Sequence, residues 1–204
     1  MSTETDLYSG PVEVMLCKAQ EVIPAATALV GGTVLEPKWD GFRAVLQVTP
    51  KGRTTYWSRK GTNLSSAFPD LVNAARDQVP AGVVLDGEVV AWVNGRLSFD
   101  HLQQRMASRP AAVARLARQY PATYVAFDIL AVDGADVRGL PWRDRRQLLD
   151  ELANGFEPPI QVSPYTEDYD TAAEWFTELA SAGVEGLVAK GAASRYRPGE
   201  RGAW

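Results

Sequence analysis

The alternation of apolar and polar residues predicts a chain of short strands interspersed with amphipathic helices. Two signals identify the strands. β-branched and aromatic residues are frequent within them, and clusters of Gly, Asp or Asn lie where they end. Strands are predicted over residues 34–48, with a polar interruption at 38–41, and over 54–58, 83–93, 124–132 and 186–190.

The helical pattern, with apolar residues three and four positions apart, occurs in four stretches. These are residues 68–79, 99–118 with a break near Pro110, 142–152, and 171–182. In the last helix we expect Trp175, Phe176 and Leu179 to face the core, and Gly183 to end the helix. Because strands outnumber helices without alternating regularly with them, we predict an α+β fold of antiparallel sheets flanked by helices.

Length and composition narrow the class of protein. The 204 residues suit one domain, and 46% of them are hydrophobic, which is ordinary for a globular core. Cys17 and His101 are the single residues of their kinds, so a metal site would need a hard ion such as magnesium or manganese, held by oxygen ligands. Neither a signal peptide nor a long apolar run is found, so we expect a cytoplasmic protein without membrane contact.

The formal net charge of −4 argues against a surface coated by nucleic acid. The charge is uneven, however: four arginines and no acid lie between Arg105 and Arg118, and four arginines with one acid lie between Arg138 and Arg146. Two interpretations remain open, namely solvated helix faces and a local basic face that binds phosphates.

The polar interruption Lys38-Trp39-Asp40-Gly41 is the first candidate for chemistry. A lysine at the end of an apolar strand is costly unless it has a role. Its amine becomes a nucleophile only when deprotonated, which burial or neighbouring cations favour, and it can then form covalent intermediates. Gly41 allows a tight turn beside a ligand. Alone, this four-residue pattern is weak.

Four later segments strengthen the case, because each places polar residues beside apolar strand positions, where a site on a sheet gathers them. They are Ser58-Arg59-Lys60-Gly61, Asp86-Gly87-Glu88, Phe127-Asp128-Ile129-Leu130, and Glu185-Gly186-Leu187-Val188-Ala189-Lys190.

In this order and spacing, the five segments resemble the covalent nucleotidyltransferase superfamily, and within it the ATP-dependent DNA ligases. Leu102-Gln103-Gln104-Arg105 and Tyr196-Arg197-Pro198-Gly199, followed by Arg201 and Trp204, look like the bacterial branch of those ligases. The resemblance runs from about Pro11 to Trp204. It implies an ATP-grasp-like nucleotidyltransferase (adenylation) domain over residues 1–204.

The resemblance implies roles around the nucleotide. Lys38 would attack the α-phosphorus of ATP and become lysyl-AMP, and Lys190 would touch the α-phosphate. Glu36 would lie near the adenine amino group, and Phe127 would stack on the purine.

It also implies contacts to ribose, metal and DNA. Arg43 and Arg59 would contact ribose, phosphate or the DNA end. Lys60 and Arg105 would also bind DNA. Glu88 would bind the ribose hydroxyl or help to hold Mg²⁺ (or Mn²⁺), and Glu185 would hold the metal ion.

The function implied is nick sealing in DNA repair: AMP passes from the lysine to a DNA 5′-phosphate, and a 3′-hydroxyl then displaces it. Expected partners are nicked double-stranded DNA and DNA-repair proteins, with the chain itself a monomer. Ligases of this kind continue past the position of Trp204 into two lysines and an oligonucleotide-binding barrel, so we expect an isolated domain of reduced activity. The alternatives are an RNA capping enzyme or RNA ligase relative, and a non-catalytic nucleotide-binding fragment.

Overall fold

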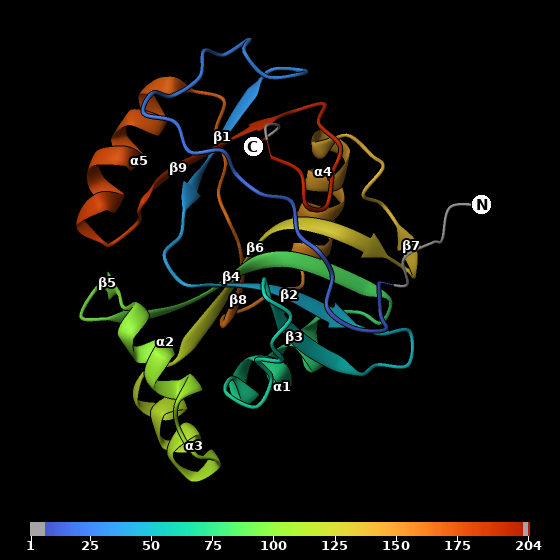
Figure 1. Ribbon diagram of the computed structural model, residues 1–204, viewed down its shortest axis with the longest axis vertical. Helices are drawn as coiled ribbons and strands as arrows, with labels where there is room; N and C mark the ends of the chain where they lie inside the picture. Colours follow the sequence, from blue (N-terminus) through green and yellow to red (C-terminus); the bar gives the residue numbers. More distant parts are fainter. Residues whose placement is uncertain (1–6, 202–203) are drawn as a thin grey trace.

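The computed structural model describes residues 7–201 and 204, and a larger and a smaller β-sheet organise this part of the chain (Figure 1). The larger sheet has seven strands in the path β3-β2-β4-β6-β7, with β5 paired to β4 and β8 paired to β6. Only the β6–β8 pair is parallel among the described strands. The bounds are β2 (Phe42–Val48), β3 (Thr54–Ser58), β4 (Val83–Val93), β5 (Arg96–Leu97), β6 (Ala122–Val132), β7 (Ala135–Asp136) and β8 (Ile160–Val162).

The smaller sheet is the antiparallel pair of β1 (Thr33–Lys38) and β9 (Gly186–Gly191). Its register places Glu36 opposite Val188, and Val34 opposite Lys190. Because side chains alternate along a strand and paired residues share a face, Glu36, Lys38 and Lys190 point to the same side of this sheet.

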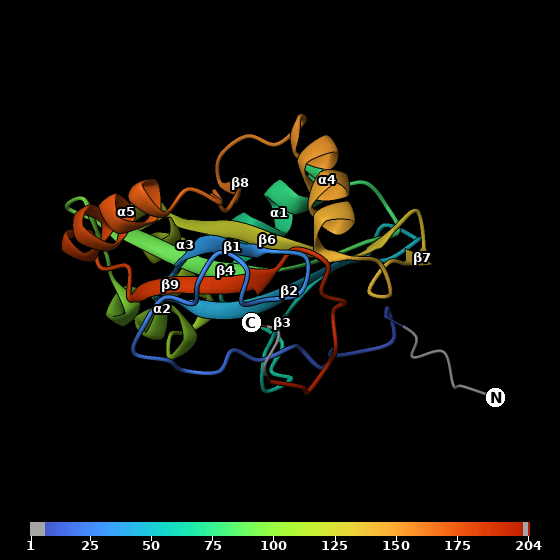
Figure 2. The same cartoon turned by 90° about the horizontal axis from the view of Figure 1, so that it is seen from above.

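The helices are α1 (Pro69–Gln78), α2 (Phe99–Met106), α3 (Pro110–Gln119), α4 (Trp142–Ala153) and α5 (Tyr169–Ser181). Leu71 of α1, Leu102 of α2 and Leu149 of α4 are fully buried in the core on one face of the larger sheet. Figure 2 shows α5 beside the smaller sheet, and its contacts are with β1 and β9.

The opposite face of the larger sheet carries a second core. Val45, Val84 and Leu130 of the strands pack there with Met15 and Trp204, which lie in segments near the two ends of the described chain. Backbone hydrogen bonds join these segments: Leu16 donates to the carbonyl of Glu200, and Lys18 donates to that of Trp204.

Most of the predicted elements are confirmed. The polar interruption separates β1 from β2, and the break at Pro110 separates α2 from α3. The prediction for Phe176 is wrong, since it is 57% exposed, and the buried residue of α5 is Ala172. The reason is that α5 covers a sheet of only two strands, which is too narrow to bury a wide face of the helix.

The predicted α+β class with antiparallel sheets and flanking helices is confirmed. In the described part of the chain, no helix is both long and apolar enough to cross a membrane.

Candidate active site

Seven of the sequence-predicted side chains meet where the two sheets face each other, and we call this set the intersheet site. They come from five regions of the chain: β1, β2, β4, β6, and β9 together with Glu185, the residue just before it. The set is Glu36, Lys38, Arg43, Glu88, Phe127, Glu185 and Lys190.

Lys38 is the last residue of β1 and stands at the open edge of the site. Its side chain is 45% exposed, so the burial expected for a reactive lysine is not found. Its ammonium instead forms an ion pair with Glu185, whose own backbone amide donates to the Lys38 carbonyl. The last residue of β1 and the residue just before β9 thus hold each other in place.

Gly41 is required in the turn after Lys38 by a close approach of backbone rather than by an unusual dihedral angle. A Cβ at this position would collide with the carbonyl oxygen of Val89 on β4. Any other residue would push β2 away from β4 at the point where Arg43 faces Glu88.

Glu36 and Lys190 form an ion pair inside the protein, with Lys190 Nζ 2.8 Å from Glu36 Oε1. Lys190 also donates to the Phe127 carbonyl at 3.1 Å, which ties the smaller sheet to β6. Burial raises the pKa of Glu36, although the positive charge of Lys190 opposes the shift. Within the described structure, Glu36 Oε1 is contacted by the Lys190 ammonium alone, so a donor from a ligand would have to take the place of Lys190 at this oxygen.

Arg43 points into the site from β2, held by a bidentate pair with the buried Asp86. Its Nε and Nη2 donate to the two carboxylate oxygens at 3.1 and 2.7 Å. Burial opposes the charge on Arg43, but Asp86 outweighs it and raises the pKa of the guanidinium. Arg43 therefore remains a fixed cation.

Glu88 lies beside Arg43 on the neighbouring strand. Burial raises its pKa to about 8, with the nearby positive charges of Arg43 and Lys38 opposing the shift. Near neutral pH its carboxyl is thus largely protonated in the absence of a further cation, and it can then donate a hydrogen bond as well as accept one.

Phe127 is half-buried, and its ring is surrounded by cations and by an indole. Lys190 Nζ lies 4.9 Å and the Arg43 guanidinium carbon 5.4 Å from the ring centroid, within the range of cation–π attraction. The Trp204 ring packs edge-on against it, with centroids 6.1 Å apart. The site is filled by its own side chains in this structure, so a purine stacked on Phe127 would have to displace one of these neighbours.

The remaining predicted residues lie outside the intersheet site. Arg59 and Lys60 are exposed in the turn that follows β3. Arg105 is only 1% exposed; its guanidinium donates to Asp70 and to the Ala67 carbonyl and lies over the Phe68 ring. The expected contact of Arg105 with DNA is therefore not supported, because a charge that joins α2 to α1 in the core does not reach a phosphate.

Sequence reasoning missed the residues that support Arg43. Asp86, Tyr196 and Trp204 were noted only as members of motifs. Asp86 and the Trp204 ring contact the guanidinium, and Tyr196 contacts Asp86. A charged residue within an apolar strand, as at Asp86, is a signal that a buried partner exists. No local signal links it to Tyr196, which lies 110 positions later.

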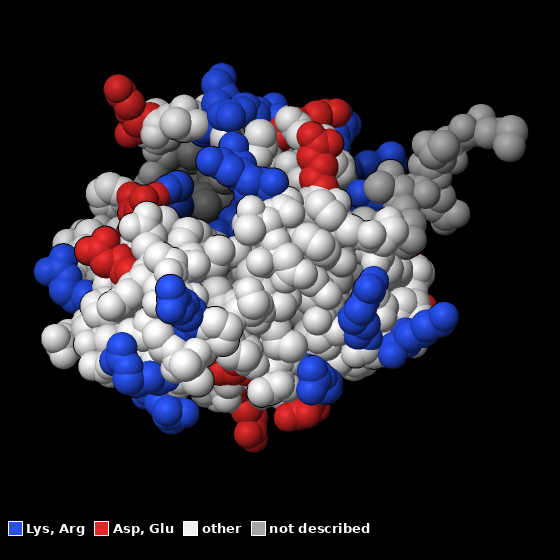
Figure 3. Space-filling view, turned by 60° about the horizontal axis from the view of Figure 1, so that its bottom comes forward, with Lys and Arg blue, Asp and Glu red and all other residues white. Residues whose placement is uncertain are grey.

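The basic run between positions 138 and 146 does not form a phosphate-binding face. All four arginines between positions 138 and 146 are paired with carboxylates, as Arg138–Asp136, Arg143–Glu167, Arg145–Asp128 and Arg146–Asp150. On the face shown in Figure 3, Lys and Arg side chains lie around a broad uncharged area with acidic side chains among them. For this run the structure supports the interpretation as internally paired charges. In the run between Arg105 and Arg118 only Arg105 is ion-paired with a described residue, and Arg109, Arg115 and Arg118 are exposed, so both interpretations stay open there.

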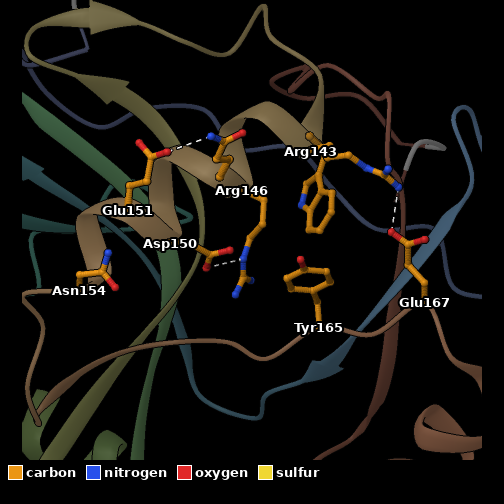
Figure 4. Close-up of a pocket in the computed structure, with 9 residues that line it drawn as sticks. Arg143, Arg146, Asp150, Glu151, Asn154, Tyr165 and Glu167 are labelled. Atoms are coloured by element: carbon orange, nitrogen blue, oxygen red, sulfur yellow. Dashed lines mark hydrogen bonds and ion pairs between the residues drawn. The ribbon is translucent and has the colours of Figure 1, made fainter.

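A separate hollow of about 460 Å³ lies beside α4 and contains none of the predicted site residues (Figure 4). Its arginines are occupied by acids of the same hollow, with Arg146 2.9 Å from Asp150 and Arg143 2.8 Å from Glu167. The buried Trp142 lines it, and Lys190 Nζ lies 5.9 Å from the indole ring.

Comparison with known proteins gives a consistent family. The family model described as "ATP dependent DNA ligase domain" matches residues 14–204. DNA ligase C2 of Mycolicibacterium smegmatis is 38% identical over 94% of this chain and 52% of its own length. DNA ligase C of Mycobacterium tuberculosis is 35% identical over the same shares. The chain thus spans about half the length of these curated relatives.

Solved structures agree with the sequence comparison. The ligase domain of LigD from M. tuberculosis superposes with a TM-score of 0.73 at 30% identity, over 94% of this chain and 58% of that one. A mycobacterial DNA ligase D complexed with ATP and MES gives 0.69 at 30% identity, over 93% and 58%. With the ordered motifs converging on one site, the match over nearly the whole chain shows that this protein belongs to the ATP-dependent DNA ligase domain family.

Proposed function

We propose that Lys38 is the nucleophile of a DNA ligase reaction and accepts AMP from ATP. Its neutral amine would attack the α-phosphorus, forming a nitrogen–phosphorus bond as the bond to pyrophosphate breaks. AMP would then pass to the 5′-phosphate of nicked double-stranded DNA, and the 3′-hydroxyl would displace it as the nick closes.

The convergence around Lys38 carries this proposal. Arg43 and Lys190 bring two cations to the site from two different sheets, and the carboxylate of Glu185 contacts the lysine itself. Displacement at phosphorus develops negative charge on the non-bridging oxygens and on the leaving group, and cations fixed in advance stabilise it. Membership in the DNA ligase family favours this reaction over the RNA-directed alternatives.

Glu36 and Phe127 are suited to select the base. Glu36 Oε1, once released by Lys190, would accept a hydrogen bond from the adenine amino group, and the Phe127 ring would stack on the purine. When ATP binds, the ion pair between Lys190 and Glu36 would break. Glu36 would then contact the base, and Lys190 would contact the α-phosphate.

Glu185 and Glu88 are the residues that would hold Mg²⁺ or Mn²⁺. No group of three or more metal-ligating side chains occurs in the described residues. Such a group is unnecessary, because Mg²⁺ is commonly bound by one or two carboxylates, with waters and substrate phosphates filling the other positions. Glu185 fits, since its side chain is 48% exposed at the reacting lysine. When bound, the ion would neutralise charge on the phosphates.

Replacement of Lys38 tests the proposal directly. The parent chain, Lys38→Ala and the matched surface control Lys51→Ala would be incubated with ATP and Mg²⁺ and measured by intact-protein mass spectrometry under denaturing conditions. We expect a covalent AMP adduct on the parent and on Lys51→Ala, and none on Lys38→Ala, because no other lysine stands in the Lys-x-Asp-Gly context.

An adduct of equal yield on Lys38→Ala would disprove the assignment of the nucleophile. Absence of an adduct from the parent under saturating ATP would count against covalent transfer by this chain.

A further inference from the structure

Arg43 owes its orientation to one buried carboxylate. Asp86 has no exposed side-chain area and accepts two hydrogen bonds from the guanidinium, one on each oxygen. The Nη1 group of Arg43 makes no hydrogen bond to any described residue, so its donors are available to a ligand. The direction in which these donors point depends on how Asp86 itself is held.

Tyr196 holds Asp86 from the other side. Its hydroxyl donates to Asp86 Oδ2 at 2.7 Å, the same oxygen that accepts from Arg43 Nη2. That hydroxyl also accepts from the backbone amide of Met15 at 3.1 Å, and the residue is 3% exposed. Because the phenol is fixed by the Met15 amide, the carboxylate has one favourable rotation, and the guanidinium paired to it has one favourable plane.

Aromatic rings restrict the same guanidinium. Its central carbon lies 5.4 Å from the Phe127 ring and 5.6 Å from the Trp204 ring. The Tyr196 ring packs edge-on against Trp204, with centroids 5.5 Å apart. Tyr196 therefore contacts both the carboxylate and one of the rings that enclose Arg43.

We propose that Tyr196 is a positioning residue that, through Asp86, aims Arg43 at the substrate phosphates. The proposal rests on the proposed function for the identity of that substrate. Loss of the hydroxyl should leave Arg43 charged and paired but free to rotate with Asp86. A misplaced group of this kind commonly costs on the order of tenfold or more in rate.

The chain offers a matched control. Tyr124 is likewise fully buried in the larger sheet. Its hydroxyl shares its one hydrogen between the Ala44 carbonyl at 3.0 Å and the Leu85 carbonyl at 3.1 Å, on the sheet face away from the intersheet site. Tyr124→Phe removes a buried hydroxyl without touching Arg43. It therefore reports what Tyr196→Phe would do through destabilisation alone.

The first measurement needs no catalysis. In ¹⁵N-labelled protein, the Arg43 Nε–H signal, assigned by its loss in Arg43→Lys, should exchange slowly with water because it is buried and bonded to Asp86. We expect Tyr196→Phe to speed this exchange at least tenfold and Tyr124→Phe to leave it unchanged. If Tyr196→Phe fails to fold, Asp86→Asn takes its place, and the Arg43 Nε–H should then exchange faster with water.

The second measurement is the rate of AMP adduct formation against ATP concentration. Tyr196→Phe should lower the maximal rate about tenfold with little change in half-saturating ATP, since the residue is buried and its hydroxyl is bonded to Asp86 and Met15. In an Arg43→Lys background the same substitution should change the rate less than twofold, because the group that it positions is gone.

Two results would overturn the proposal: an unchanged Arg43 signal in Tyr196→Phe, or equal rate losses in Tyr196→Phe and Tyr124→Phe. Failure of the parent to form any adduct would count against the proposed function, whereas the exchange measurement would still decide whether Tyr196 holds Arg43.

Discussion

The buried carboxyl group of Glu88 makes the stability of the protein depend on pH. Its pKa in the folded protein is about 8, raised by burial, against an ordinary value of 4.5 in the unfolded chain. Between these two values the folded state binds more protons than the unfolded state, so the free energy of unfolding decreases as pH rises from about 4.5 to about 8.

We therefore expect Glu88→Gln, which cannot ionise, to be about as stable as the parent at pH 5 and more stable by about 1–3 kcal/mol at pH 9. Chemical denaturation at both pH values measures the difference. The exposed Glu178→Gln on α5 is the control and should show no such divergence. If the unfolding free energies of the parent and of Glu88→Gln changed equally with pH, Glu88 would ionise freely in the folded state.

The motifs of the candidate site could be recognised at the residue scale because each is local. Lys38, Glu88 and Glu185 stand beside apolar strand residues, and the order of their motifs resembles one family. The support of Arg43 was not readable, because Asp86 and Tyr196 are joined only by the fold. Nor could the sequence show that Lys190 would be paired with Glu36 rather than free.

At the scale of elements, apolar periodicity located the strands and helices but did not show how much of each helix would be covered. Phe176 has the right spacing for a core residue and is nevertheless exposed, because the sheet beneath α5 is narrow. Arg105 shows the opposite limit. The sequence pattern left open whether this arginine contacts DNA or forms a salt bridge in the core, and Asp70 and the Phe68 ring hold it in the core.

Arg105 should accordingly matter for stability rather than for DNA. Its removal would break the ion pair with Asp70, delete the hydrogen bond to Ala67, and leave a cavity between α2 and α1. Because Asp70 is 27% exposed and can be partly hydrated, we expect Arg105→Ala to lose about 2–4 kcal/mol of unfolding free energy.

Urea denaturation measures this loss, with Arg115→Ala on the exposed face of α3 as the control, expected to be within about 0.5 kcal/mol of the parent. A folded Arg105→Ala protein of unchanged stability that binds nicked DNA more weakly would restore the role in DNA binding.

At the scale of the whole molecule, charge limits how this chain can engage DNA. Its net charge is −4, and the arginines between 138 and 146 are neutralised by carboxylates of the same chain. Affinity for duplex DNA comes largely from counterions released by phosphate contacts, and each contact contributes about −0.9 to the slope of log K against log salt. The net negative charge opposes the approach of phosphates, and the paired arginines between 138 and 146 supply no such contacts.

We therefore predict that the 204-residue chain binds nicked duplex weakly, in the range of about 10⁻⁶–10⁻⁴ M at physiological salt, with a slope shallower than about −4. Arg59→Ala and Lys60→Ala, at exposed positions expected to contact DNA, should each flatten the slope by about one. Arg138→Ala should leave it unchanged, because this side chain is already bonded to Asp136. Fluorescence anisotropy over a range of salt concentrations gives both quantities. Nanomolar affinity with a slope near −8 would mean that the paired arginines exchange their carboxylates for phosphates when DNA binds. The ion pairs of the free protein would then differ from those of the DNA-bound protein.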